Sequence, residues 1–203
     1  MQPEEKRLPV YIVDDDQAAC ESLSMMLEDH DFHTQAYTDG RFFLENYDAS
    51  AAGCVILDSR MPDLNGQQLH QRIREEGSPL SVIFLTGYGD VPMAVQALQS
   101  GAVHFFQKPV KADVLIPAIE DALNTSLEQA EKLALRKAFD TLTSREIDIL
   151  KLLIIGQRNA SIADELCIAV RTVEVHRASL MKKFAANTIA ELAFRYGKLN
   201  ETL

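Results

Sequence analysis

The sequence predicts an α/β domain built on a doubly wound, five-stranded parallel sheet, followed by a small all-α domain of four helices containing a helix-turn-helix. Three observations support this fold class. The chain has 203 residues, which is enough for two domains. Up to residue 123, five short apolar runs alternate with five helical patterns, as in a doubly wound sheet, and only helical patterns follow. The charge balance also changes between the two parts.

This change in charge suggests that the two parts have different partners. Residues 1–123 contain 8 Lys and Arg against 20 Asp and Glu, a formal charge of −12. Residues 124–203 contain 12 against 10, a formal charge of +2. An acidic part can bind cations, and a basic part is a candidate for binding nucleic acid.

The elements of the first part follow from apolar spacing. The predicted strands are Val10–Val13, His33–Tyr37, Val55–Leu57, Val82–Leu85 and Val103–Phe106. The predicted helices cover residues 19–27, Arg41–Tyr47, Gly66–Glu76, Val91–Leu98 and Asp113–Leu123. In the second helix, Phe42, Phe43 and Leu44 are expected to face the core. Asp39 and Asp90 precede helices and are candidate N-caps.

Polar side chains stand where four of these strands end. Asp14 and Asp15 follow the first strand, Asp58 the third, Thr86 the fourth and Lys108 the fifth. The carboxyl ends of parallel strands lie at one edge of a sheet, so these five residues should converge there. Each residue alone is more often a cap or a turn residue, but their order on successive strands favours a site.

The chemistry of this set points to phosphoryl transfer. Three carboxylates in one pocket repel each other unless a cation lies among them, and oxygen ligands suit Mg²⁺, with Mn²⁺ as a second choice. One carboxylate, Asp58, could then accept a phosphoryl group. Lys108 would neutralise a phosphate oxygen, and the hydroxyl of Thr86 would donate a hydrogen bond to another.

Four segments resemble the receiver domain of two-component response regulators: Val13–Asp16, Asp58–Pro62, Leu85–Gly87 and Lys108–Pro109. The resemblance implies that Asp58 accepts phosphate from a sensor histidine kinase. It implies that Mg²⁺ is held by Asp15, Asp58 and the backbone carbonyl of Arg60, with Asp14 acting largely through water. It also implies that Thr86 and Lys108 contact the phosphoryl group.

The resemblance further implies a conformational switch made by Thr86 and Phe105, where Phe105 lacks the hydroxyl of a tyrosine. Arg60 and Tyr88 occupy positions that tune phosphoryl lifetime in this family. The stretch Thr86–Val95 narrows the resemblance to receivers of the FixJ type.

The second part begins after a connector. We expect a receiver at residues 8–123, a helical linker at 124–140, which has neither Pro nor Gly, and a helix-turn-helix domain at 141–203. Thr143 and Glu146 form a predicted capping box. Helices are expected from there to Gly156, over Ala160–Leu166, over Arg171–Phe184 and over Thr188–Tyr196.

Residues 139–200 resemble LuxR-type helix-turn-helix domains, through Leu142–Glu146 and Arg171–Arg177 above all. Val173 and Leu180 are expected in the core. Contacts with base edges in the major groove are predicted for Glu174, Arg177 and Ala178. Contacts with DNA phosphates are predicted for Thr172, His176, Lys182 and Lys183. Arg171 and Val175 complete the predicted DNA-binding set. Ala169 replaces a frequent Ser before this helix, so its N-cap should be weaker or come from another residue.

The combined prediction is a cytoplasmic transcription regulator of the NarL/FixJ type. Its implied partners are a sensor histidine kinase, double-stranded promoter DNA, a second copy of the chain upon phosphorylation, and RNA polymerase. It would not be an enzyme, apart from catalysing its own phosphorylation and dephosphorylation. No apolar run approaches bilayer length. The three cysteines are expected to be reduced core thiols, since they are odd in number and far apart.

Two other functions compete with this prediction. An aspartyl-phosphate phosphatase would need an acid two residues after its nucleophile, and position 60 is Arg. A receiver with an RNA- or protein-binding output is the other alternative, and the stretch Arg171–Arg177 argues against it.

Overall fold

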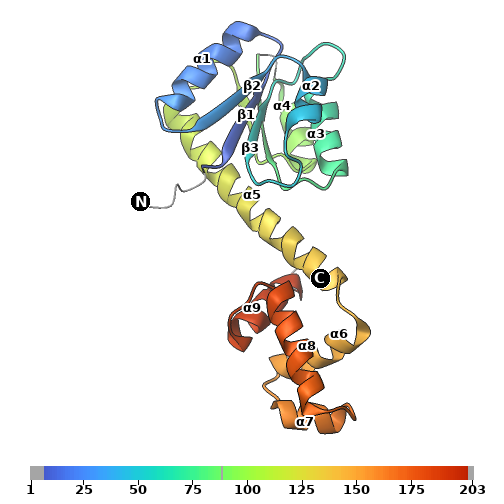
Figure 1. Ribbon diagram of the computed structural model, residues 1–203. Helices are drawn as coiled ribbons and strands as arrows, with labels where there is room; N and C mark the ends of the chain where they lie inside the picture. Colours follow the sequence, from blue (N-terminus) through green and yellow to red (C-terminus); the bar gives the residue numbers. More distant parts are fainter. Residues whose placement is uncertain (1–6, 88, 201–203) are drawn as a thin grey trace. The chain divides into compact units, whose positions relative to one another are not determined.

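The protein is described by a computed structural model covering residues 7–87 and 89–200 (Figure 1). Its chain forms two compact units, with the boundary between Ala130 and Glu131. Each unit has its own apolar core. The predicted fold class is confirmed: a parallel sheet with alternating helices is followed by an all-helical domain.

The first unit contains a five-stranded sheet in the order β2-β1-β3-β4-β5, with every neighbouring pair parallel. The strands are β1 (Pro9–Val13), β2 (His33–Tyr37), β3 (Cys54–Leu57), β4 (Ser81–Thr86) and β5 (His104–Gln107). All five predicted strands are present. β3 and β4 are buried along their whole length, which explains why they read as continuous apolar runs.

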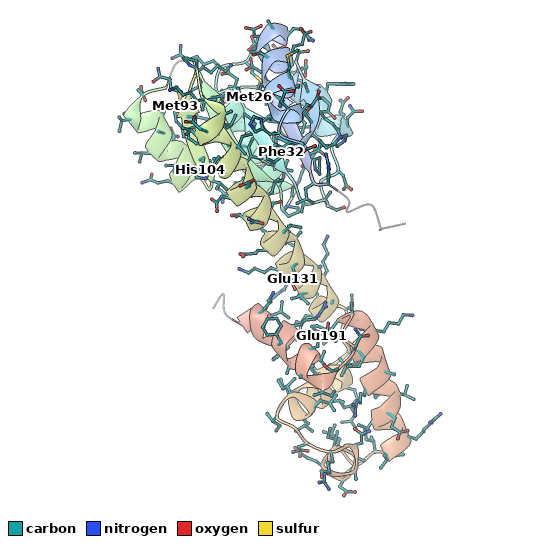
Figure 2. All side chains as sticks on the ribbon, turned by 90° about the vertical axis from the view of Figure 1, so that its left-hand side faces the viewer. Met26, Phe32, Met93, His104, Glu131 and Glu191 are labelled. Carbon is teal, nitrogen blue, oxygen red and sulfur yellow. The ribbon has the colours of Figure 1, made fainter. Side chains whose placement is uncertain are left out.

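Helices cover both faces of this sheet (Figure 1). They are α1 (Gln17–Glu28), α2 (Gly40–Asn46), α3 (Gly66–Glu75), α4 (Val91–Gln99) and α5 (Ala112–Asp140). One core cluster joins alternate strand residues to α1 and α5, and Met26 and Phe32 pack against it (Figure 2). The other cluster joins the opposite strand faces to α2, α3 and α4. The period-2 alternation of β1, β3 and β4 therefore supplies both cores.

Helix starts follow the predicted capping chemistry. The carboxylates of Asp39 and Asp90 accept backbone N–H bonds at the first turns of α2 and α4. Asp16 does the same for α1. One prediction for α2 is wrong: Phe42 is 58% exposed, whereas Phe43 is fully buried. A helix this short presents only one narrow face to the sheet, so three consecutive residues cannot all point inward.

α5 is a single helix where the sequence suggested a receiver helix and a separate helical linker. Within the first unit it is anchored by Ser126, whose side chain is fully buried. Its hydroxyl donates to the carbonyl of Pro79 at 2.7 Å and accepts from the N–H of Gly53 at 2.9 Å. One hydroxyl thus satisfies two buried backbone groups that would otherwise be unpaired.

The second unit adds four shorter helices to the end of α5. They are α6 (Ser144–Ile154), α7 (Asn159–Glu165), α8 (Val170–Lys183) and α9 (Ile189–Asn200). The capping box of Thr143 and Glu146 is present at the start of α6. Val173 and Leu180 are fully buried, as predicted. Ala169 provides no side-chain cap for α8, which also agrees with the prediction.

The cysteines divide into two groups. Cys20 and Cys54 are buried free thiols. Cys167 is exposed, in the tight turn before α8, so the expectation that it lies in the core is wrong. Within the described residues, no helix has the length and apolar character needed to cross a bilayer.

Candidate functional site

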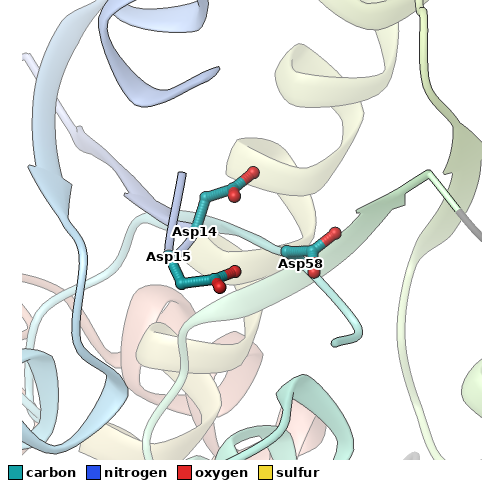
Figure 3. Close-up of side chains that lie close together, drawn as sticks. All are labelled: Asp14, Asp15 and Asp58. Carbon is teal, nitrogen blue, oxygen red and sulfur yellow. The ribbon is translucent and has the colours of Figure 1, made fainter. Parts of the chain in front are cut away.

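Three carboxylates meet at the carboxyl edge of the sheet. Val13 of β1 pairs with Leu57 of β3, so Asp14 and Asp58 leave their strands at the same level. Asp15 follows directly. Each of the three offers an oxygen within 4.8 Å of the others (Figure 3). Asp14 and Asp58 are buried, whereas Asp15 is exposed. Of the five residues predicted to converge, these three acids therefore lie together.

Lys108 brings a positive charge into this group from the end of β5. Its ammonium makes an ion pair with Asp14, and its Nζ lies 3.4 Å from Oδ1 of Asp58. Burial alone would lower the pKa of Lys108, but the hydrogen bond and charge of Asp14, together with Asp58, raise it above its ordinary value. Lys108 therefore remains cationic beside the carboxylates.

The backbone also fixes the position of Asp58. The N–H of Arg60 donates to Oδ2 of Asp58 at 2.8 Å. Gly66, the first residue of α3, packs so closely that a Cβ there would overlap the carbonyl oxygen of Asp58. Only glycine permits this approach, so the start of α3 is tied to the position of Asp58.

Thr86 and Phe105 lie on neighbouring strands beside these acids. Thr86 is fully buried at the end of β4. Phe105 is half-buried and packs against Phe84, with ring centroids 6.2 Å apart. A Cβ on Gly89 would lie 2.8 Å from Cε1 of Phe105, so the aromatic ring covers the loop after β4. Tyr88, which was predicted to tune phosphoryl lifetime, lies outside the described residues.

The acidic group suits a divalent cation. In the stretches 7–87 and 89–200, Asp14, Asp15 and Asp58 are the one cluster of three or more His, Cys, Asp or Glu residues that could hold a metal ion. Hard carboxylate oxygens at this spacing match the ligand chemistry of Mg²⁺. A cleft of about 550 Å³ opens beside them, lined by Asp15, Ser59, Arg60, Met61, Pro62, Asn65, Gln67 and Met93. Of the three carboxylates, Asp15 lines this cleft directly.

α8 carries the second candidate site, a nucleic-acid interface. Arg171, Glu174, Val175, Ala178 and Lys182 are exposed on it. Thr172, His176, Arg177 and Lys183 are half-buried. No side chain caps α8, and the N–H of Thr172 donates to the carbonyl of Ala169 at 2.9 Å.

Several predicted DNA-binding side chains already have protein partners. Arg171 makes an exposed ion pair with Glu174 at 3.5 Å. Nη1 of Arg177 lies 3.5 Å from Oδ1 of Asn159, a long contact that leaves the guanidinium free to rearrange. Lys183 is held more firmly than the sequence suggested, by Glu146 and the carbonyl of Thr141, and its phosphate contact stays a prediction.

Glu146 is the centre of a buried polar network that joins α6 to α8. Its carboxylate accepts from Nζ of Lys183 at 2.8 Å, from the hydroxyl of Ser179 at 2.7 Å and from the N–H of Thr143 at 2.9 Å. Lys183 also donates to the carbonyl of Thr141. Burial alone would raise the pKa of Glu146, but these donors lower it from 4.5 to about 2. The network therefore links the ends of α6 and α8.

Sequence reasoning missed two contributors to these sites. The Arg60 N–H that orients Asp58 has no sequence signal, because every residue except proline carries that group. The capping box identified Glu146 as a helix-start residue, but its bond to Lys183 joins positions 37 residues apart. Only the tertiary fold reveals that pairing.

Two family models match the chain, one on each part. Residues 10–120 match the model described as "Response regulator receiver domain". Residues 140–195 match the model described as "Bacterial regulatory proteins, luxR family". Together these matches cover both candidate sites.

Similar proteins extend over nearly the whole chain. The tetrathionate response regulatory protein TtrR of Salmonella typhimurium is 42% identical over 94% of this chain and 92% of its own. The transcriptional regulatory protein FixJ of Bradyrhizobium diazoefficiens is 39% identical, over 95% and 97%. Among solved structures, the response regulator StyR matches with a TM-score of 0.71 and 34% identity, covering 95% of this chain and 99% of its own.

The lowered pKa of Glu146 predicts a specific acid sensitivity of the second unit. A carboxyl group whose pKa is lower in the folded state stabilises that state above its unfolded pKa, near 4.5, and the contribution is lost as pH falls toward about 2. We expect Glu146→Gln to remove about 3 kcal/mol of stability at pH 7 and to abolish this pH dependence. The free energy of unfolding of the second unit is measured by urea titration of the full chain, in which the NMR methyl signals of Leu150 and Leu180 report unfolding.

Glu165→Gln, which removes an exposed carboxylate of α7, is the matched control. If Glu146→Gln and wild type lost stability equally between pH 4.5 and 2, the assignment of this pKa would be wrong.

Proposed function

Since the chain belongs to the two-component response regulators, with a phosphate-accepting receiver and a LuxR-type DNA-binding output, we propose that phosphorylation of Asp58 controls its binding to promoter DNA. The observation that carries this proposal is the meeting of three carboxylates and Lys108 at one edge of the sheet. No other acid in this cluster has both the N–H of Arg60 and the ammonium of Lys108 directed at its carboxylate.

The proposed reaction transfers a phosphoryl group from a phosphohistidine of a sensor kinase. A carboxylate oxygen of Asp58 forms a bond to phosphorus while the bond from phosphorus to the histidine nitrogen breaks. The electron pair of that bond stays on the imidazole nitrogen, and one proton, carried by the other ring nitrogen or taken from water, makes the leaving imidazole neutral. The product is an aspartyl phosphate. The protein contributes to this reaction mainly by positioning the reacting groups and by stabilising charge on the phosphoryl oxygens.

Lys108 and Thr86 would act on the transferred group. Lys108 lies close enough to Asp58 to exchange part of its ion pairing with Asp14 for a phosphate oxygen. The hydroxyl of Thr86 would donate a hydrogen bond to another phosphate oxygen once β4 and its loop adjust. Both interactions strengthen as negative charge builds on the phosphoryl oxygens.

Asp14, Asp15, Asp58 and the carbonyl of Arg60 would hold Mg²⁺, and Mn²⁺ has similar ligand chemistry. When bound, the ion supplies positive charge that offsets the crowded carboxylates and the incoming phosphate. Asp15, the exposed member, is open to an ion arriving from solvent. Asp14 is already engaged by Lys108, so we assign it a supporting role in holding the ion.

The proposed output is formation of a homodimer. Movement of Thr86 toward the phosphate would free space for Phe105, which covers Gly89 just before α4. α4 exposes Val91, Val95 and Leu98, which lie on one helical face, and Val91 is 76% exposed. Burial of such a face against a second copy gains hydrophobic free energy. A shift at Phe105 would change the position of α4 and so the fit of this face.

The dimer would then present two copies of α8 to paired half-sites in duplex DNA. We assign base contacts to Glu174, Arg177 and Ala178. Phosphate contacts are assigned to Arg171, Thr172, His176, Lys182 and Lys183, with Val175 beside the DNA backbone. The sensor histidine kinase, a cytoplasmic location and contact with RNA polymerase complete the proposal.

We predict that Asp58→Asn abolishes the response to phosphorylation, because an amide cannot form an acyl phosphate. Full-length wild type should dimerise when beryllofluoride and Mg²⁺ are added, as measured by light scattering, and Asp58→Asn should stay unchanged. Asp63→Asn is the control, since Asp63 is an exposed acid in the same loop and Asn tolerates its positive φ of 63°. An equal dimerisation response in Asp58→Asn would exclude Asp58 as the acceptor.

A second prediction concerns Arg177. Arg177→Ala should weaken binding by about 1–3 kcal/mol, the range for one bidentate contact to a base. The measurement uses a duplex selected in vitro with the wild-type protein, at physiological salt. Lys151→Ala, an exposed cation on α6, provides the control. Unaltered affinity in Arg177→Ala, with a folded domain, would remove this residue from the base-contact set.

A further inference from the structure

The cleft that Asp15 lines adjoins the phosphate acceptor. Ser59 and Arg60, the two residues that follow Asp58 in the chain, line it as well. Asp15 and Asp58 each offer an oxygen within 4.8 Å of the other. The cleft, with a volume of about 550 Å³, therefore begins next to Asp58, although Asp58 itself does not line it.

An in-line transfer sets how far the leaving group of a phosphoryl donor lies from Asp58. Reacting atoms come within about 3–3.5 Å of each other before the step, and the leaving atom lies one bond further from the acceptor. That places the leaving atom roughly 5 Å from the Asp58 oxygen, similar to the 4.8 Å within which Asp15 lies. A leaving group at this distance is outside the group of carboxylates, where the cleft has room for it.

Part of the cleft wall is apolar. Met61 and Pro62 line it from the loop after β3, and Met93 lines it from α4. The two charged residues of the lining, Asp15 and Arg60, are of opposite sign, and the other lining residues are neutral. Apolar surface and balanced charge suit a group without net charge, because a charged group loses its hydration there.

Met93 contributes to this wall without being part of the core. Its backbone N–H donates to the carboxylate of Asp90 at 2.8 Å, which fixes it in the first turn of α4. Its side chain, labelled in Figure 2, is half-buried. Among the described residues, Met93 belongs to neither apolar core cluster of the first unit. Its thioether can therefore be changed with little effect on the packing of the sheet.

We propose that Met93, together with Met61, binds the leaving imidazole of the phosphoryl donor and so selects ring-bearing N-phosphoryl donors over acyl phosphates. Thioether sulfur makes favourable contacts with aromatic rings, and methionine adapts its shape to a ligand. Imidazole leaves as a neutral planar ring, whereas acetate leaves as a hydrated anion that gains nothing from an apolar wall. The inference rests on the proposed function and assigns a residue that determines its donor specificity.

Free N-phosphoimidazole undergoes the same bond changes as a phosphohistidine. An oxygen of Asp58 bonds to phosphorus, the bond from phosphorus to nitrogen breaks, and its electron pair stays on the ring. A proton from the other ring nitrogen or from water leaves the imidazole neutral. Acetyl phosphate gives the same aspartyl phosphate but releases acetate. The two donors therefore differ in the leaving group and share the acceptor chemistry.

The test compares the two donors on full-length protein with Mg²⁺. Phosphorylation rate constants are measured by intact-protein mass spectrometry, with Asp58→Asn as the blank. Met93→Ala should lower the rate constant for N-phosphoimidazole about threefold to tenfold, the effect of losing the contact between sulfur and ring, and leave that for acetyl phosphate unchanged. Met93→Leu, which keeps an apolar side chain without sulfur, should recover part of the loss.

Met25→Ala is the matched control, since Met25 is 68% exposed on α1 and does not line the cleft; it should react like wild type with both donors. An equal loss with both donors in Met93→Ala would mean that Met93 supports the site as a whole, and would overturn the proposal. Unchanged rate constants with both donors would overturn it too. If wild type gained no phosphate at Asp58 from either donor, the proposed function itself would fail, so the two failures are distinguishable.

Discussion

The interaction on which the receiver site depends is the pairing of Lys108 with Asp14 and Asp58. Three carboxylates lie within 4.8 Å of one another, two of them buried, and Lys108 supplies one compensating charge. Burial of uncompensated charge is costly, so the remaining negative charge favours a cation among the acids. The same imbalance explains how the site can respond to a phosphoryl group. In the proposed reaction, a dianionic phosphoryl group on Asp58 would compete with Asp14 for Lys108.

Close packing carries that local change into the surrounding elements. Gly66 sits directly on the carbonyl of Asp58, and Gly89 lies under the ring of Phe105. Neither contact leaves space for independent movement, because protein interiors are packed at the density of organic solids. Asp58 is therefore connected to α3, and Phe105 is connected to the loop before α4. Two arrangements of these contacts would serve as the two states of a switch.

Strand ends and apolar periodicity predicted most of the fold, including all five strands, the caps at Asp39 and Asp90 and the meeting of the carboxylates. These features can be predicted because each depends on residues close in the sequence or on the common direction of parallel strands. The exposure of Phe42 and Cys167 depends on which narrow face meets a neighbour, and the pairing of Lys183 with Glu146 depends on distant segments. Periodicity carries neither kind of information. Residues 124–140 contain no helix breaker, which is compatible with one continuous helix and also with two separate helices. The sequence alone therefore did not predict that α5 continues past residue 123.

The central claim is that Asp58 receives the phosphoryl group, and chemical trapping tests it most directly. Full-length protein would be incubated with acetyl phosphate and Mg²⁺, then reduced with borohydride, which converts an aspartyl phosphate to homoserine. Peptide mass spectrometry locates the product. The account predicts homoserine at position 58 alone, at a yield that falls strongly in Lys108→Ala. Homoserine at position 14 or 15, or none at position 58 in protein that dimerises with acetyl phosphate, would contradict it.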